Sequence, residues 1–268
     1  MEAVKTLIRN AFHQVGYDLV KFPRVSRAKK HYEPITPFAT YSPWNLDSQF
    51  LETYAAVRHH TLVDLYRCYE LWKLVEQVAN VEGAIIEVGV WRGGTGALIA
   101  KKAQICGLGC PVYLCDTFAG VPKACDQDGH YSGGEHADTS RALVESLAAR
   151  LGVGDVRILE GIFPEESAHA VENTMFRLCH IDVDVYQSAK DIVEWIWHRM
   201  PQGGIIVLDD YGTCGCEGIT KCVDEQADLP DRVVLYNLNG HALAIKTATT
   251  GVASAKYTAS PPLPAVPF

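Results

Sequence analysis

Short apolar runs alternate with helical patterns along most of the chain. The apolar runs lie at residues 84–88, 112–115, 156–159, 176–181 and 204–208. Apolar residues spaced as on one helix face occupy residues 62–78, 95–106, 140–151, 165–172 and 188–200. Continuous apolar strands separated by helices are typical of a parallel sheet covered on both faces. The pattern therefore predicts an α/β fold, whose first regular helix we expect to begin at Thr61, because Asp64 follows it at capping-box spacing.

The pattern changes after a further helix at residues 218–227. Apolar segments at 233–236 and 242–245 flank Asn239-Gly240, a pair that favours a tight hairpin turn. We therefore expect a mostly parallel seven-stranded sheet that ends in an antiparallel hairpin. This arrangement is typical of the Rossmann-like class I methyltransferase fold, with helices on both faces, whereas dinucleotide-dependent dehydrogenases usually lack the hairpin.

The two ends of the chain differ from the middle. Apolar residues at helical spacing from Val4 to Val15 predict an N-terminal helix, and a proline-rich segment with several basic residues follows it. We expect residues 1–50 to form this helix and a covering arm, either solvated and contacting a second subunit of a homo-oligomer or touching an anionic surface. Residues 51–248 are the expected catalytic domain, and residues 249–268, rich in alanine, serine and proline, the expected flexible tail.

The charge balance narrows the range of partners. The 268 residues carry 24 Lys plus Arg against 32 Asp plus Glu, a net charge of −8, which argues against nucleic acid as the main partner. No apolar run approaches the roughly 18 residues of a membrane span, and the N-terminus has no signal-peptide core, so stable membrane insertion is not expected and we predict a cytoplasmic protein. Nine cysteines without a paired spacing predict reduced, mostly buried thiols.

A glycine-rich turn follows the first predicted strand. Glu87 comes just before it, and Gly89 and Gly93 would let the backbone approach a ligand without a Cβ in the way. Trp91 breaks the glycine spacing of a dinucleotide fingerprint, and no Gly-Lys-Ser or Gly-Lys-Thr of a phosphate loop is present. Asp116 closes the second strand, where a carboxylate can accept both hydroxyls of a ribose.

Together these residues favour a nucleoside that carries a sulfonium and an amino acid over one that carries phosphates. They point to S-adenosylmethionine, held by Glu87, Gly89, Gly93 and Asp116. Gly161, just past the third strand, is placed to border the adenine.

Four aspartates lie at the ends of two predicted strands: Asp182, Asp184, Asp209 and Asp210. Neighbouring parallel strands are about 4.8 Å apart, so these carboxylates should converge at one sheet edge. Crowded acids resist ionisation unless a cation compensates, and oxygen ligands select a hard ion such as Mg²⁺. A bound divalent cation both orients a hydroxyl and lowers its pKa.

Our assignment is Asp182, Asp209 and Asp210 as metal ligands and Asp184 as general base. A competing assignment places Asp184 in the metal shell, and a third possibility is that some of these aspartates only cap the following helices. His136, in a polar loop at residues 126–138, is a second candidate for proton removal, and Tyr186 and Tyr211 are candidates for the edge of the acceptor pocket.

These segments resemble the macrocin O-methyltransferase family of the TylF/MycF type. The resemblance is carried by Glu87 to Gly94, Asp116 to Pro122, Ile181 to Tyr186 and Leu208 to Tyr211, and it spans about residues 50–247. Thr117 and Ala119 stand where serine and glutamate are more usual. The resemblance implies a Mg²⁺-dependent transfer of methyl from S-adenosylmethionine to a hydroxyl, commonly on a sugar of a natural product, and it implies the metal and base roles given above.

Three alternatives to methylation of a glycosidic or polyhydroxylated small-molecule acceptor remain open. One is methylation of a catechol-like phenol with the same cofactor and metal. Another is a nucleoside-binding protein on the same fold without turnover, and Asp184 beside a complete acid set argues against it. A nicotinamide-dependent dehydrogenase is the last, and Trp91 disfavours it.

Overall fold

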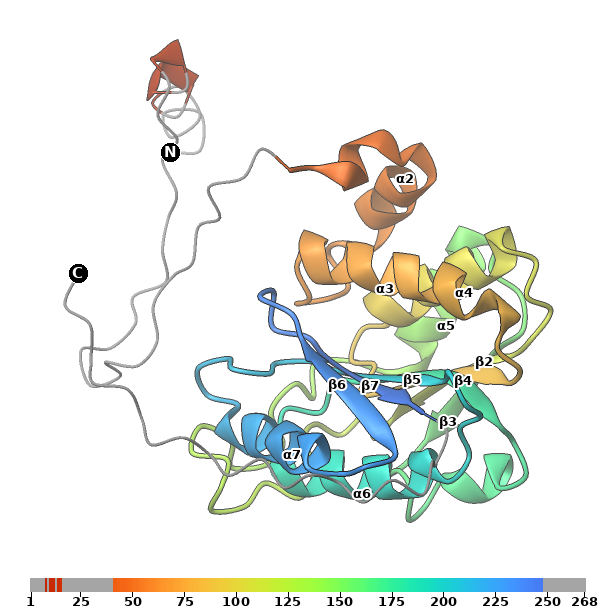
Figure 1. Cartoon of the computed structure of the whole chain (residues 1–268). Coiled ribbons are helices and arrows are strands. Elements are labelled where there is room, and N and C mark those ends of the chain that lie inside the picture. The colour runs from red at the N-terminus through yellow and green to blue at the C-terminus, as the bar shows by residue number, and fades with distance from the viewer. Residues whose placement is uncertain (1–7, 9, 13, 16–40, 248–268) are drawn as a thin grey trace. The chain divides into compact units, whose positions relative to one another are not determined.

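The computed structural model describes residues 8, 10–12, 14–15 and 41–247 (Figure 1). The chain divides into two units, Met1–Tyr41 and Ser42–Phe268. In the first unit, residues 8, 10–12 and 14 are helical, as the N-terminal pattern predicts. The predicted covering loop between residues 16 and 40 and the predicted tail from residue 249 lie outside the described residues, and the expected domain start at residue 51 falls within helix α2 (Ser48–Val57).

A mixed seven-stranded sheet forms the centre of the second unit. Its strand order is β3-β2-β1-β4-β5-β7-β6, and β1 to β5 run parallel while β7 and β6 form the predicted antiparallel hairpin. The strand order reverses between β1 and β4, which are hydrogen-bonded neighbours. The strands are β1 (Ala84–Val88), β2 (Val112–Asp116), β3 (Val156–Glu160), β4 (Phe176–Ile181), β5 (Ile205–Leu208), β6 (Arg232–Tyr236) and β7 (Ala242–Lys246).

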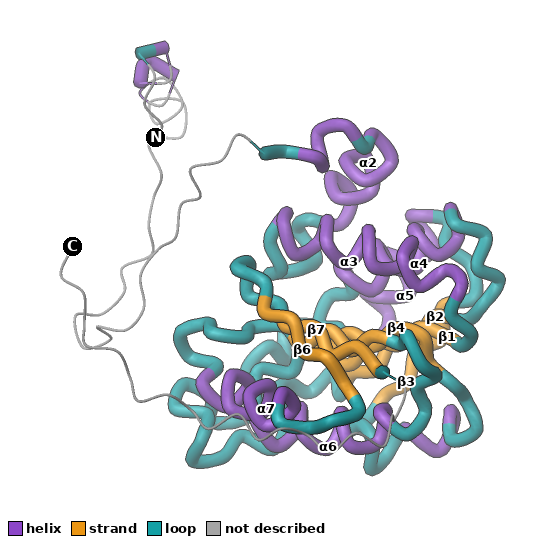
Figure 2. The backbone as a smooth tube through the Cα atoms, in the orientation of Figure 1, coloured by secondary structure: helices purple, strands orange, loops and turns teal. Residues whose placement is uncertain are grey.

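Helices cover both faces of the sheet (Figures 1 and 2). One face carries α3 (Leu65–Gln77), α4 (Gly94–Ile105) and α5 (Arg141–Leu151), and α2 packs on α3 and α4. The other face carries α6 (Tyr186–Trp197), α7 (Glu217–Ala227) and the 3₁₀ helix η3 (Ala168–Val171). The short 3₁₀ helices η1 (Pro43–Leu46) and η2 (Val78–Asn80) flank α2 and α3 in the chain.

Successive residues of a strand pack into two separate hydrophobic cores, because side chains point alternately to the two faces of a sheet. Ile85 and Leu178 pack with the α3–α5 layer, while Ile86 and Cys179 pack with the α6–α7 layer. Complete burial of each such aliphatic side chain stabilises the fold by about 1.5–3 kcal/mol. All nine cysteines lie in the described part of the chain and none forms a disulfide.

Two predicted elements differ from the observed ones. Helix α3 begins at Leu65, not at Thr61, because the Asp64 side chain caps it by accepting hydrogen bonds from the amides of Tyr66 and Arg67. The helix predicted at residues 165–172 is only the single 3₁₀ turn η3. Within the described residues, no helix is both long and apolar enough to cross a membrane.

Candidate active site

A cavity of about 580 Å³ opens at the carboxyl ends of the parallel strands. Its wall is built from the loops after β1 to β5, around the point where the strand order reverses. In open α/β sheets this is the usual place for a ligand. The wall includes most of the predicted cofactor and metal residues together with the predicted base: Gly89, Asp116, Gly161, Asp182, Asp184, Asp209 and Asp210.

The turn after β1 is held by its neighbours. Gly89 has a φ of +87°, and a Cβ there would lie 1.8 Å from the carbonyl oxygen of Asp182, so only glycine allows this approach. Asp116 Oδ2 accepts hydrogen bonds from the amides of Val90 (2.7 Å) and Trp91 (2.8 Å). Its carboxylate therefore orders the glycine turn as well as lining the cavity.

Glu87 and Gly93, also predicted to bind the cofactor, are not among the residues that line the cavity. Glu87 is fully buried in β1 and points under α4, where a Cβ on Gly96 would lie 2.5 Å from Oε2. Gly93 caps α4 with a φ of +84° and packs against Val144. Glu87 and Gly93 therefore support the turn from the side that faces away from the cavity.

The four aspartates converge as the strand order requires. Asp182, Asp209 and Asp210 offer oxygens that lie within 4.8 Å of one another. Asp184 forms a second such group with Asp210 and the thiol of Cys216. Strands β4 and β5 are parallel neighbours, so the loops that follow them bring the acids to one edge.

Three of the four acids resist ionisation. Burial, followed by the charge of Asp209, raises the pKa of Asp182 well above its usual value and that of Asp210 to about 7. Burial also raises the pKa of Asp184. Asp209 behaves differently: burial alone would raise its pKa, but His241 and Arg67 beside it lower that pKa below its usual value.

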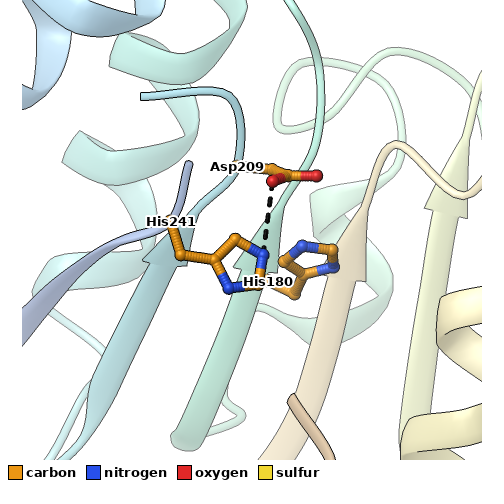
Figure 3. A group of neighbouring side chains, drawn as sticks. All are labelled: His180, Asp209 and His241. Atoms are coloured by element: carbon orange, nitrogen blue, oxygen red, sulfur yellow. Dashed lines mark ion pairs between the residues drawn. The ribbon is translucent and has the colours of Figure 1, made fainter. Parts of the chain in front are cut away.

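Arg67 and His241 were not identified by the sequence analysis. Arg67 Nη1 on α3 lies 2.5 Å from Asp209 Oδ1 and 3.1 Å from Asp210 Oδ1. His241 Nε2, just before β7, lies 3.2 Å from Asp209 Oδ1 (Figure 3). Both residues lie outside the glycine and aspartate segments, and only the packing of α3 on the sheet and the pairing of β7 with β5 bring them to Asp209.

The loop at residues 126–138 supplies part of the cavity wall. Tyr131, which the sequence analysis did not single out, donates a hydrogen bond of 2.7 Å to Asp184 Oδ1. His136 Nε2 lies 3.9 Å from Asp184 Oδ2, so the loop histidine is near the predicted base.

The two tyrosines expected at the edge of the acceptor pocket face elsewhere. Tyr186 donates to Glu225 and Tyr211 to Asp224, both on α7, and neither tyrosine lines the cavity. Each ring follows a site aspartate by one or two residues, but the turn into the next element directs it toward α7.

A ligand cavity at the reversal of strand order, in a sheet closed by an antiparallel hairpin, is the arrangement of class I S-adenosylmethionine-dependent methyltransferases. Two solved structures share this fold with a TM-score of 0.61. The O-methyltransferase NovP is 23% identical, and the match covers 70% of this chain and 83% of NovP. The calicheamicin methyltransferase CalS11 is 17% identical, and the match covers 85% of this chain and 99% of CalS11.

The chain belongs to the macrocin-O-methyltransferase (TylF) family, whose model matches residues 51–236. It is thus an S-adenosylmethionine-dependent O-methyltransferase, as the sequence motifs predict. Mycinamicin III 3''-O-methyltransferase of Micromonospora griseorubida is 28% identical over 207 residues, 70% of this chain and 79% of the relative. The 8-demethyl-8-(2,3-dimethoxy-alpha-L-rhamnosyl)-tetracenomycin-C 4'-O-methyltransferase of Streptomyces olivaceus is 31% identical over 171 residues, 59% of this chain and 64% of the relative.

Proposed function

We propose that this enzyme transfers a methyl group to a hydroxyl of a sugar or other polyhydroxylated small molecule, and that the transfer requires Mg²⁺. The observation that carries the proposal is the group of converging carboxylates in the cavity wall, whose negative charge the neighbouring cations only partly balance. The family and the named reactions of the relatives support a hydroxyl acceptor, since both relatives are named O-methyltransferases and the name of one contains a rhamnosyl group.

The donor set fits a hard divalent cation. Arg67 and His241 both contact Asp209 Oδ1, and Asp182 has no comparable short ion pair among those the described residues form. Raised pKa values at Asp182 and Asp210 mark places where added positive charge would be favourable. Three carboxylates without nitrogen or sulfur ligands suit Mg²⁺. Asp182, Asp209 and Asp210 would hold the ion, which would lower the pKa of the acceptor hydroxyl.

Asp184 is our candidate general base. Tyr131 occupies Oδ1 of this carboxylate, which leaves Oδ2 to accept the proton of the acceptor hydroxyl. Burial raises the pKa of Asp184 above its usual value, which makes its carboxylate a stronger base. The competing assignment, with Asp184 in the metal shell and Asp182 as base, uses the same four residues, and His136 is the alternative acceptor for the proton.

Cofactor binding is assigned to the part of the wall formed after β1 to β3: Gly89, Asp116 and Gly161. The bound cofactor supplies an electrophilic methyl group on a sulfonium. The cavity residues hold the acceptor oxygen in line with that methyl and exclude water. This positioning of the two reacting atoms supplies most of the rate enhancement of such a transfer. Glu87 and Gly93 support the turn, and we propose that they act on the cofactor through it.

The test is methyl transfer from S-adenosylmethionine to a panel of glycosides and catechols, with and without EDTA. We expect turnover on glycosides, at least a tenfold loss with EDTA, and recovery on adding Mg²⁺. Turnover that is unchanged in EDTA would overturn the metal requirement. Turnover on catechols but not on glycosides would favour the phenol alternative. The cofactor is the same in both assays, so a difference in turnover reports on the acceptor alone.

A further inference from the structure

Two fully buried histidines, His180 and His241, lie close to Asp209. His180 lies in β4 and His241 just before β7, and their ring centroids are 5.8 Å apart. Asp209 follows β5, the strand between them in the sheet. Figure 3 shows both rings at the carboxyl-end edge of the sheet, close to the Asp209 carboxylate.

Each ring is held by a carboxylate at Nδ1. His180 Nδ1 is 2.8 Å from Glu87 Oε1, and His241 Nδ1 is 2.6 Å from Glu70 Oε2. With a carboxylate oxygen as the acceptor, Nδ1 is the donor in both rings. In the neutral imidazole this leaves the lone pair on Nε2.

Neither Nε2 atom has a hydrogen-bond partner, although both are completely buried. His241 Nε2 is 3.2 Å from Asp209 Oδ1 but does not form an aligned hydrogen bond with it. A buried polar atom without a partner is unfavourable, and here two of them lie beside one carboxylate. A histidine that donates Nδ1–H to a carboxylate and presents a free Nε2 is the usual arrangement of a metal ligand.

We infer that His180, Asp209 and His241 form a site for a divalent transition metal of the zinc type, next to the aspartate site proposed for Mg²⁺ and sharing Asp209 with it. One ligand atom from each residue lies within 4.8 Å of the other two. Bonds of about 2.0–2.1 Å in a tetrahedral site place ligand atoms about 3.3 Å apart, and the 3.2 Å between His241 Nε2 and Asp209 Oδ1 matches this edge.

The ligand types separate this site from the aspartate site. Imidazole nitrogen suits zinc, cobalt or nickel, whereas Mg²⁺ takes oxygen ligands. The two sites share Asp209, which belongs both to the group with the two histidines and to the group with Asp182 and Asp210. A metal at the histidines would link β4, the end of β5 and the start of β7.

Cobalt(II) binding to the EDTA-treated full-length enzyme tests the inference without S-adenosylmethionine or an acceptor. We expect one equivalent to bind with the intense visible d–d absorption of tetrahedral cobalt, which cobalt on the aspartate oxygens would not give, and at least a tenfold loss of affinity for this equivalent in His180→Gln and in His241→Gln. His198→Gln, an exposed histidine at the end of α6, is the matched control and should bind as the wild type does. Asp182→Asn should keep the cobalt spectrum, because Asp182 belongs only to the Mg²⁺ site.

X-ray absorption of the zinc-loaded wild type gives a second measurement that needs no variant to fold. We expect two imidazole nitrogens at about 2.0–2.1 Å. The inference fails if the wild type takes up neither metal, if both histidine variants bind cobalt unchanged, or if the zinc spectrum lacks imidazole scattering. In those cases His241 is a protonated bridge between Glu70 and Asp209 and carries no metal.

Discussion

The role of each aspartate in this site depends on whether a neighbouring cationic side chain pairs with its carboxylate. Asp209 is matched by Arg67 and His241, whereas burial raises the pKa of both Asp182 and Asp184. An aspartate therefore supplies a lasting negative charge at position 209, whereas at positions 182 and 184 it can take up and release a proton more readily. Aspartates of the same two strand ends can accordingly divide the metal and base roles.

Substituting Asp184 and Asp182 separates the two assignments. If Asp184 is the base, Asp184→Asn should lower kcat by about 10²–10⁴-fold and leave affinity for Mn²⁺, used as a probe for Mg²⁺, nearly unchanged. Asp182→Asn should weaken Mn²⁺ binding at least tenfold. Electron paramagnetic resonance of bound Mn²⁺ and single-turnover kinetics measure the two effects.

The opposite result, weak Mn²⁺ binding in Asp184→Asn and normal binding in Asp182→Asn, would favour the competing assignment. Asp155→Asn is the control, because Asp155 forms an ion pair with the exposed Arg157 of β3 and is outside the cavity wall. It should change neither quantity.

At the scale of elements, side chains of helix α3 contact both Asp209, which follows β5, and the turn of the β6–β7 hairpin. Its cap Asp64 accepts from the amides of Tyr66 and Arg67 and, through Oδ2, from the Arg67 guanidinium at 2.9 Å. One turn further, Glu70 accepts from His241 and from Asn239 in the turn between β6 and β7. The first turn of α3 therefore positions the Arg67 guanidinium against Asp209.

Removal of the α3 cap should affect both stability and the site. Asp64→Ala should lower the free energy of unfolding by about 1–2 kcal/mol, since a cap and an ion pair are lost together. It should also weaken Mn²⁺ binding, because Arg67 loses the carboxylate that orients its guanidinium toward Asp209. Urea denaturation and Mn²⁺ titration are the measurements.

Ser140→Ala provides the comparison for that variant. Ser140 caps α5 through the amide of Leu143, far in the chain from the acids, so its loss should cost about 1 kcal/mol and leave Mn²⁺ binding unchanged. Equal effects of the two variants on Mn²⁺ binding would mean that the α3 cap has no particular connection with the site.

For the molecule as a whole, the raised carboxylate pKa values tie stability to pH. Asp210 titrates at a pKa of about 7 in the folded protein, while an exposed aspartate titrates at about 3.9. Between these values the folded protein binds more protons than the unfolded chain, so the stability that Asp210 contributes falls as pH rises through this window. Asp182 and Asp184 shift in the same direction.

A divalent cation should offset this loss by binding to the ionised carboxylates. We expect saturating Mg²⁺ to raise the melting temperature by several degrees at about pH 7.5 and by much less at about pH 5.5, where protons compete. Calorimetry at the two pH values is the measurement. An equal rise at both, or the same pH dependence in Asp210→Asn, would contradict the role given to these acids.

Much of the fold and of the cavity wall could be predicted because the relevant signals are local. Apolar runs at residues 84–88 and 176–181 locate strands by themselves, and Asn239-Gly240 specifies the hairpin turn. Carboxyl ends of parallel strands share one edge, so the sequence alone places Gly89, Asp116 and the four aspartates together. The α3 start was misplaced because Thr61 and Asp64 are both acceptable caps by residue type.

By itself, the sequence determined the class of fold, the family and the residue types at the strand ends, since periodicity and short motifs are properties of neighbouring positions. Only the tertiary structure decided which partners those residues have. Glu87 lies behind the cofactor turn, Tyr186 faces α7, and Arg67 and His241 lie on Asp209. Such pairings depend on how the helices pack on the sheet and on how the hairpin pairs with β5, and no spacing along the chain records them.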